Sequence, residues 1–192
     1  MARELRERSR ELRAVEAALD DAARGRGRVV VVEGDPGIGK TSLVAAALER
    51  AEERGMRVLA ARGSELERAF AFGVVRQLVE PLLYRATRAQ CERWFAGAAA
   101  LARPLFENEV APDGLEAEEE VRFRRRHGLY WLVANLARDG ALLLAVDDLQ
   151  WVDDPSLGFL RHLAMRIGHL PAVLLVATRA GAAEARPLIG DP

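Results

Sequence analysis

The stretch that most constrains the fold of this chain is VVVVEGDPGIGKTSL, residues 29–43. It contains the pattern G-x-x-x-x-G-K-[ST], which forms a phosphate-binding loop when a buried strand precedes it and a helix follows. Both contexts are present, because the β-branched run before the loop is continuous and a helical pattern resumes at Lys40. The motif therefore predicts a strand, loop and helix that bind a chain of phosphates.

The residue types in the loop suit an anion. Glycines at 34, 37 and 39 allow backbone N–H groups to turn inward, and the following helix adds its positive dipole end. Lys40 is the only lysine among 28 basic residues, and its compact ammonium fits where an arginine fork would not. The alternative, a glycine-rich surface turn, is disfavoured by the full match. The predicted nucleotide-binding residues are Gly34, Asp35, Pro36, Gly37, Ile38, Gly39, Lys40, Thr41 and Ser42.

Two acidic residues follow a second apolar run, ALLLAV at 141–146. We expect the hydroxyl of Thr41 and the carboxylate of Asp147 to bind Mg²⁺. In a strand, Asp148 would point to the opposite side from Asp147, so it is the candidate catalytic residue that polarises a water near the terminal phosphate. The alternative is a pair of surface acids at the end of a strand.

A third apolar run after the loop, PAVLLVATR at 171–179, ends in Thr178 and Arg179. It should reach the same edge of a parallel sheet, where ligands bind. Arg179 is therefore a candidate catalytic residue that senses the terminal phosphate. The sequence leaves open the alternative that Arg179 only begins a solvated loop.

The order of the elements predicts an α/β fold of three layers with a mostly parallel sheet. One domain, 1–192, is expected, with an N-terminal helix, a nucleotide-binding core at 28–180 and a C-terminal connector at 181–192. Asp154 is predicted to cap a helix that runs to about Ile167, and Pro81 should kink or end another. Strands are expected at 29–32, 56–63, 142–146 and 171–179, and further helices at 3–23, 40–54, 73–83, 89–106 and 117–138.

Composition excludes several classes of protein. With 28 basic and 29 acidic residues, the chain lacks the positive surplus that neutralises a phosphate backbone, so no direct nucleic-acid binding is expected. Its apolar runs are far shorter than the roughly 18 residues of a membrane span. Cys91 is the only cysteine, and the chain does not open on a signal segment, so we expect a cytoplasmic protein.

Several segments together resemble a known family. These are the loop segment, FAFGVVRQLVEPLL, HGLYWLVANLA, LLLAVDDLQWVDDPSLGFLRHL and PAVLLVATR, which cover most of residues 5–180. They are similar to the N-terminal ATPase module of large LuxR-type transcriptional regulators. Those proteins are signal-transduction ATPases with numerous domains, within the AAA-like P-loop class.

The resemblance implies a switch that binds ATP and Mg²⁺, hydrolyses ATP slowly and controls self-association or contacts with partner domains. By the same resemblance, Asp147 matches the magnesium-binding acid, Asp148 the water-polarising acid and Arg179 the sensor arginine. A distant helix-turn-helix would carry the transcriptional output. ATP and ADP are the expected small-molecule partners.

The chain departs from the family at specific positions. Glu7 stands where a glycine near the adenine is usual, and Gln150 stands where histidine is frequent. The class has five core strands, whereas four strand candidates are present. We therefore expect a fragment of a larger chain, with the fifth strand beyond Pro192 and the edge of the loop strand unpaired.

Two other functions remain open from the sequence. A small-molecule kinase would use the same loop with an acceptor pocket and a lid. An ATP-binding scaffold without turnover would follow if Asp148, a shorter arm than glutamate, reaches the water poorly. In EAEEEVRFRRRHG, an ion-paired helix face is the favoured interpretation, and an arginine from 124–126 acting across a subunit interface is the alternative.

Overall fold

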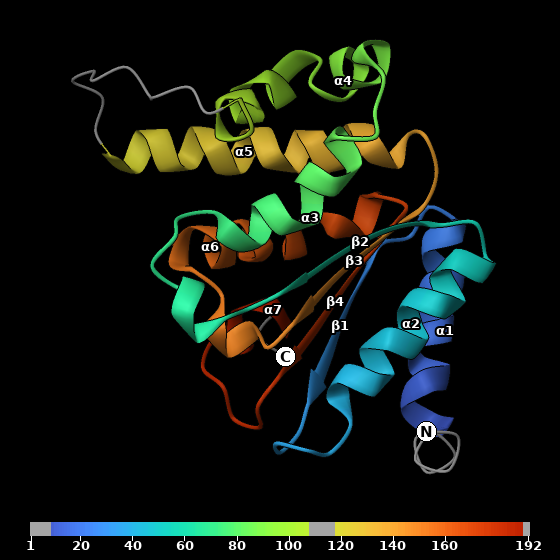
Figure 1. The fold of residues 1–192 in the computed structure, drawn as a ribbon. Helices are drawn as coiled ribbons and strands as arrows, with labels where there is room; N and C mark the ends of the chain where they lie inside the picture. The colour runs from blue at the N-terminus through green and yellow to red at the C-terminus, as the bar shows by residue number, and fades with distance from the viewer. Residues whose placement is uncertain (1–8, 108–117, 190–192) are drawn as a thin grey trace.

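The computed structural model describes residues 9–107 and 118–189 (Figure 1). Within these ranges, four strands form a single parallel sheet in the order β1-β4-β3-β2. Helices cover both faces of the sheet, so the predicted α/β fold of three layers is confirmed. The strands are β1 Arg28–Glu33, β2 Arg57–Arg62, β3 Leu142–Asp147 and β4 Ala172–Thr178.

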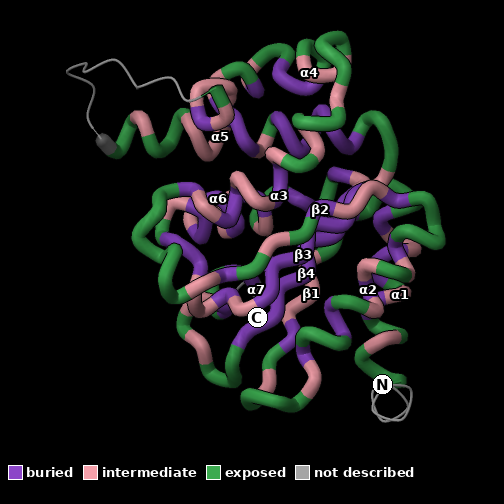
Figure 2. The backbone as a smooth tube through the Cα atoms, in the orientation of Figure 1, coloured by how far each residue is buried: buried purple, intermediate pink, exposed green. Residues whose placement is uncertain are grey.

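The two central strands explain why their sequences are continuous apolar runs. Every residue of β3 and β4 is buried, because each strand has a neighbour on both sides and helices on both faces. Figure 2 shows this as an unbroken buried stretch through the middle of the molecule. Among the described residues, β1 lies at one edge of the sheet, the position expected for the loop strand.

One face of the sheet is covered by α1 (Ser9–Ala23) and α2 (Lys40–Glu53). Their buried stripes, represented by Leu19 and Leu43, pack against alternate residues of β3 and β4 such as Leu143 and Leu175. This alternation follows from the two-residue period of a strand. The first six residues of the predicted helix 3–23 lie outside the described residues.

The other face is covered by α3 (Gly73–Leu83), α6 (Asp154–Ala164) and α7 (Arg186–Ile189). Further from the sheet lie α4 (Arg88–Trp94) and α5 (Glu118–Ala137), as Figure 1 shows. The described residues also form short 3₁₀ segments, namely η1 Glu65–Glu67, η2 Gly97–Leu105, η3 Leu149–Trp151 and η4 Ile167–His169. None of the helices in the described part of the chain combines the length and hydropathy that crossing a bilayer requires.

Three local predictions need correction or refinement. The helix expected at 89–106 is divided into α4 and η2, because Gly97 adopts a φ of +64° between them. Pro81 lies inside α3, and the helix ends two residues later at Leu83. Asp154 is not the N-cap of α6: the cap is Asp153, whose Oδ1 accepts a hydrogen bond of 2.9 Å from Ser156 N.

Asp153 also joins two helices. Its carboxylate accepts hydrogen bonds from Phe72 N at 2.8 Å and Val74 N at 3.2 Å, at the start of α3. Phe72 has a φ of +61°, which is strained for an aromatic residue. Because one buried carboxylate serves the first turns of both α3 and α6, it sets how these helices lie against the sheet.

Candidate nucleotide-binding site

The glycine-rich loop connects β1 to α2 at the carboxyl end of the sheet. Gly37 and Gly39 have φ values of +80° and +85°, so both occupy the left-handed region that favours glycine. Gly39 is the N-cap of α2, and no side chain caps that helix. The first N–H groups of a 14-residue helix are therefore available to an anion.

Lys40 is folded into the loop that precedes it. Its Nζ donates hydrogen bonds to the carbonyl oxygens of Gly34 at 2.8 Å and Asp35 at 3.0 Å, and the residue is only 8% exposed. An ammonium group has three N–H donors, so one more acceptor can be bound. A lysine is therefore held with its charge inside the loop, which is the arrangement that the lone lysine in the sequence suggested.

Thr41 and Asp147 meet across the site. Thr41 Oγ1 donates a hydrogen bond of 2.7 Å to Asp147 Oδ2, which joins the first turn of α2 to the end of β3. Asp147 is buried, and its Oδ1 accepts from the backbone N of Asp148 at 2.9 Å. A hydroxyl and a carboxylate at this distance form the hard oxygen donor set that Mg²⁺ binds, so these two residues fit the magnesium ion that the sequence predicted here.

Asp148 does not continue β3. Its φ of +53° places it in the left-handed region, so a turn of the backbone, and not strand alternation, separates its side chain from that of Asp147. Its Oδ2 accepts a hydrogen bond from Arg62 Nε at 2.8 Å and forms an ion pair with Arg62 Nη2 at 2.7 Å, while its Oδ1 accepts a hydrogen bond from Gln150 Nε2 at 3.0 Å. Both oxygens of the Asp148 carboxylate therefore accept hydrogen bonds from neighbouring side chains.

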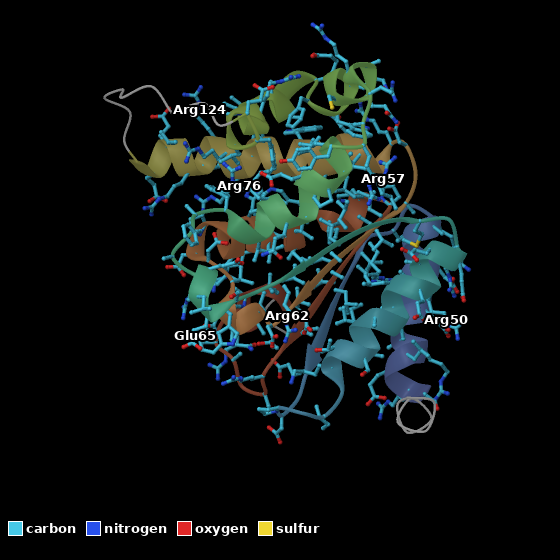
Figure 3. The ribbon with its side chains drawn as sticks, in the orientation of Figure 1. Arg50, Arg57, Arg62, Glu65, Arg76 and Arg124 are labelled. Carbon is cyan, nitrogen blue, oxygen red and sulfur yellow. The ribbon has the colours of Figure 1, made fainter. Side chains whose placement is uncertain are left out.

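Arg62 is a residue of the site that the sequence analysis missed. It is the last residue of β2, next to Asp147 in the sheet register, and Figure 3 labels it near the carboxyl end of the sheet. The hydrogen bond to Asp148 is the main reason that the pKa of Arg62 is raised. The available signal was its position at the end of a predicted strand, since all parallel strands end at the same edge.

These side chains surround one cavity of about 310 Å³. Three positive side chains and one carboxylate line it, so its field favours a polyanion. The lining residues are Pro36, Gly37, Gly39, Lys40, Thr41, Arg62, Asp148 and Arg179. A larger hollow of about 590 Å³ lies beside α3, but there Arg76 is paired with Glu80 at 2.8 Å and the loop amides are absent from the lining.

Arg179, the first residue after β4, reaches this cavity. Its guanidinium carbon lies 5.5 Å from the ring centroid of Trp151, a distance at which a cation and an aromatic face attract. Asp35, Ile38 and Ser42, by contrast, are exposed on or just after the loop and do not line the cavity. The structure therefore brings together seven of the nine predicted loop residues, if Gly34 and Asp35 are counted through the hydrogen bonds that their carbonyl oxygens accept from Lys40. It also brings together all three of the more distant residues, Asp147 through its hydrogen bond with Thr41.

Fold and site define a class of protein. A parallel sheet with a glycine-rich loop at the end of β1 and an acid at the end of β3 is a P-loop nucleotide-binding domain. Residues 4–176 match the family described as the AAA ATPase domain, and the chain belongs to that family. ATP binding by an ATPase module, as the sequence predicted, is therefore confirmed at the level of the family.

The chain spans less than half the length of three proteins to which it is similar. An uncharacterized protein of Rhizobium meliloti (strain 1021) is 27% identical over 194 residues, which cover 90% of this chain and 18% of that protein. Drosophila ORC, solved bound to DNA, has a TM-score of 0.52 at 17% identity, over 94% of this chain and 40% of that chain. The Aeropyrum pernix ORC1 protein, solved in complex with DNA, has a TM-score of 0.45 at 19% identity, over 95% of this chain and 42% of that chain. The likeness to Drosophila ORC shows a shared fold.

Proposed function

We propose that this chain is an ATP- and Mg²⁺-dependent regulatory switch that hydrolyses ATP slowly. The observation that carries the proposal is the 2.7 Å hydrogen bond between Thr41 and Asp147, beside a loop that holds the ammonium of Lys40. These groups come from α2, β3 and the loop, and together they offer donors for phosphate and ligands for a divalent cation.

Each residue has a proposed role. Loop amides and Lys40 bind the phosphates, while Thr41 and Asp147 hold the metal. Magnesium, when bound, supplies positive charge that offsets the charge of the phosphate oxygens. Asp148 accepts a hydrogen bond from the attacking water, and Arg179 contacts the terminal phosphate. Arg179 is supported in this role by the cavity that it shares with Lys40.

Slow turnover is supported by the surroundings of Asp148. Its two oxygens already accept hydrogen bonds from Arg62 and Gln150, so a water must compete for the same carboxylate. The same observation favours a second candidate, an ATP-binding scaffold without turnover, in which the Arg62 pair is never released. The two candidates differ in whether phosphate is produced.

The wider setting is also a proposal. Because the chain spans 18% of its Rhizobium meliloti relative and 40% of the Drosophila ORC chain, we propose that it is one cytoplasmic module of a longer protein. By its resemblance to LuxR-type regulators, the nucleotide state would control self-association or contacts with other domains. Although ORC was solved with DNA, a net charge of −1 argues that DNA contact would belong to another part of such a protein.

The test compares ATP binding and phosphate release in three forms of the chain. Lys40→Ala should abolish Mg·ATP binding, and Asp148→Asn should keep binding but lose phosphate release. Arg50→Ala is the matched control, since it removes a positive charge ten residues along α2, about 15 Å from Lys40. Micromolar ATP affinity in Lys40→Ala would overturn the assignment of the loop, and unchanged turnover in Asp148→Asn would remove that residue from the reaction.

A further inference from the structure

A chain of side-chain hydrogen bonds crosses the carboxyl end of the sheet beside the phosphate cavity. Thr178 Oγ1, at the end of β4, donates to Gln150 Oε1 at 3.2 Å. Gln150 Nε2 in turn donates to Asp148 Oδ1 at 3.0 Å. The side-chain amide of Gln150 therefore connects Thr178, at the end of β4, to Asp148, which follows β3. Its carbonyl oxygen and its NH₂ group each form one of the two hydrogen bonds.

The chemistry of the three groups sets the direction of this chain. An ionised carboxylate only accepts hydrogen bonds, so the NH₂ group of Gln150 must face Asp148. Its carbonyl oxygen then faces Thr178, which must donate its hydroxyl proton. The amide of Gln150 thus has one orientation that satisfies all three side chains, and Thr178 selects it.

The position of Gln150 is fixed by buried residues around it. Thr178 is fully buried in β4. The backbone on either side of Gln150 is anchored by Leu149, which is fully buried, and Val152, which is 2% exposed. The carbonyl of Asp148 also lies close to Gly63, where an added Cβ would stand 2.4 Å from it. The η3 turn is therefore packed against both β2 and β4.

The opposite oxygen of Asp148 has a less rigid partner. Arg62 holds Oδ2, but the Arg62 side chain is 67% exposed and points into a cavity whose field attracts polyanions. Exposed ion pairs contribute little to stability and exchange partners readily. When phosphates enter the cavity, Arg62 is the partner that can move toward them, while Gln150 cannot follow.

We propose that Gln150 is a positioning residue for ATP hydrolysis. It holds Oδ1 of Asp148 so that Oδ2 faces the cavity and is free to accept a hydrogen bond from water once Arg62 turns to the phosphates. This inference rests on the proposed ATPase function, because it assigns Asp148 a role in the reaction. It goes beyond that function in naming the residue that sets the geometry of Asp148.

The first test needs no nucleotide. The chain has three glutamines and two asparagines, so the side-chain NH₂ signals of a ¹⁵N-labelled sample can be assigned with Gln150→Met. Both Asp148→Asn and Thr178→Val should shift the Gln150 signals and speed their exchange with water. Signals that are unchanged in both variants would overturn the proposed chain of hydrogen bonds.

The second test separates ATP binding from turnover. Gln150→Met should leave the Kd for Mg·ATP within about threefold and lower the single-turnover rate by roughly tenfold or more, because a displaced carboxylate no longer aligns the water. Gln150→Glu keeps an acceptor for Thr178 but loses the donor to Asp148, so its rate should fall at least as far. Thr178→Val keeps that donor and should lose only a few-fold.

A double variant shows whether Gln150 acts through Asp148. In Asp148→Asn, the further change Gln150→Met should have no additional effect on the residual rate, because residues that act as a unit are not additive. Additive losses, or a normal rate in Gln150→Met while Asp148→Asn is inactive, would overturn this inference and leave the proposed function intact. Absence of turnover in the unmodified chain would instead refute the ATPase function, and the positioning role with it.

Discussion

Replacing Asp153 by alanine should destabilise the fold strongly, although Asp153 does not line the nucleotide cavity. Its carboxylate accepts three backbone hydrogen bonds, two from the start of α3 and one from the start of α6. The residue is 2% exposed, so water reaches these donors poorly after the change. Both helices would lose the group that caps their first turns.

The magnitude follows from the three bonds. A lost N-cap costs about 1 kcal/mol, and each buried donor left without an acceptor costs about 1–3 kcal/mol. Relaxation of the positive φ of Phe72 in the variant should offset about 1 kcal/mol of this loss of folding free energy. We therefore expect Asp153→Ala to lower the free energy of unfolding by about 2–6 kcal/mol. Asp153→Asn keeps one acceptor oxygen and should cost about 1–2 kcal/mol.

Urea unfolding followed by circular dichroism measures these differences. At an m-value of about 2 kcal/mol/M, the midpoint of Asp153→Ala should fall by about 1–3 M. Asp154→Ala is the matched control, since Asp154 is the exposed neighbour that the sequence favoured as the cap. A loss below about 1 kcal/mol in Asp153→Ala, or an equal loss in Asp154→Ala, would refute the reasoning.

Three further predictions concern the site and its support. Thr41→Val should raise the Kd for ATP in magnesium to the value measured in EDTA, and continued tightening by magnesium would count against Thr41 as a ligand. Gly63→Ala should lower the free energy of unfolding by about 1–3 kcal/mol, because its Cβ would lie 2.4 Å from the carbonyl oxygen of Asp148; Gly168→Ala, where a Cβ meets open space, is the control. Burial, followed by neighbouring positive charges, lowers the pKa of His162 to about 4. As the pH falls, His162 is therefore protonated near pH 6.5 in the unfolded chain but only near pH 4 in the folded chain. The free energy of unfolding should consequently decrease as the pH falls from about 6.5 to about 4. His162→Gln should remove about 1–2 kcal/mol of that fall in acid-range urea melts, and identical pH profiles would contradict it.

The loop and the sheet were predictable from local patterns. The phosphate-loop pattern from Gly34 to Thr41 is formed by consecutive residues, so it can be recognised in the sequence alone. The strands β3 and β4 are apolar up to their last residues because helices cover both faces of the sheet, and such continuous runs are also visible in the sequence. The meeting of Thr41 with Asp147 could also be expected, since parallel strands end at one edge of a sheet.

Other parts of the site could not be predicted in this way. Arg62 is one of many arginines, and only the order of the strands places it beside Asp148. The sequence favoured Asp154 over Asp153 as the cap of α6, because a run of two acids before a proline does not say which one faces the donors of a distant helix. The arrangement of Asp148 was likewise expected from strand alternation, whereas a left-handed turn produces it.

The sequence by itself determined which residues form the phosphate loop and which strands are buried, because both depend on neighbours along the chain. Only the tertiary structure decided which partners hold Asp148 and which acid joins α3 to α6. Arg62 lies 86 positions from Asp148, Phe72 lies 81 positions from Asp153, and Thr178, which orients the amide of Gln150, lies 28 positions from it. The geometry of these contacts exists only after the sheet has assembled.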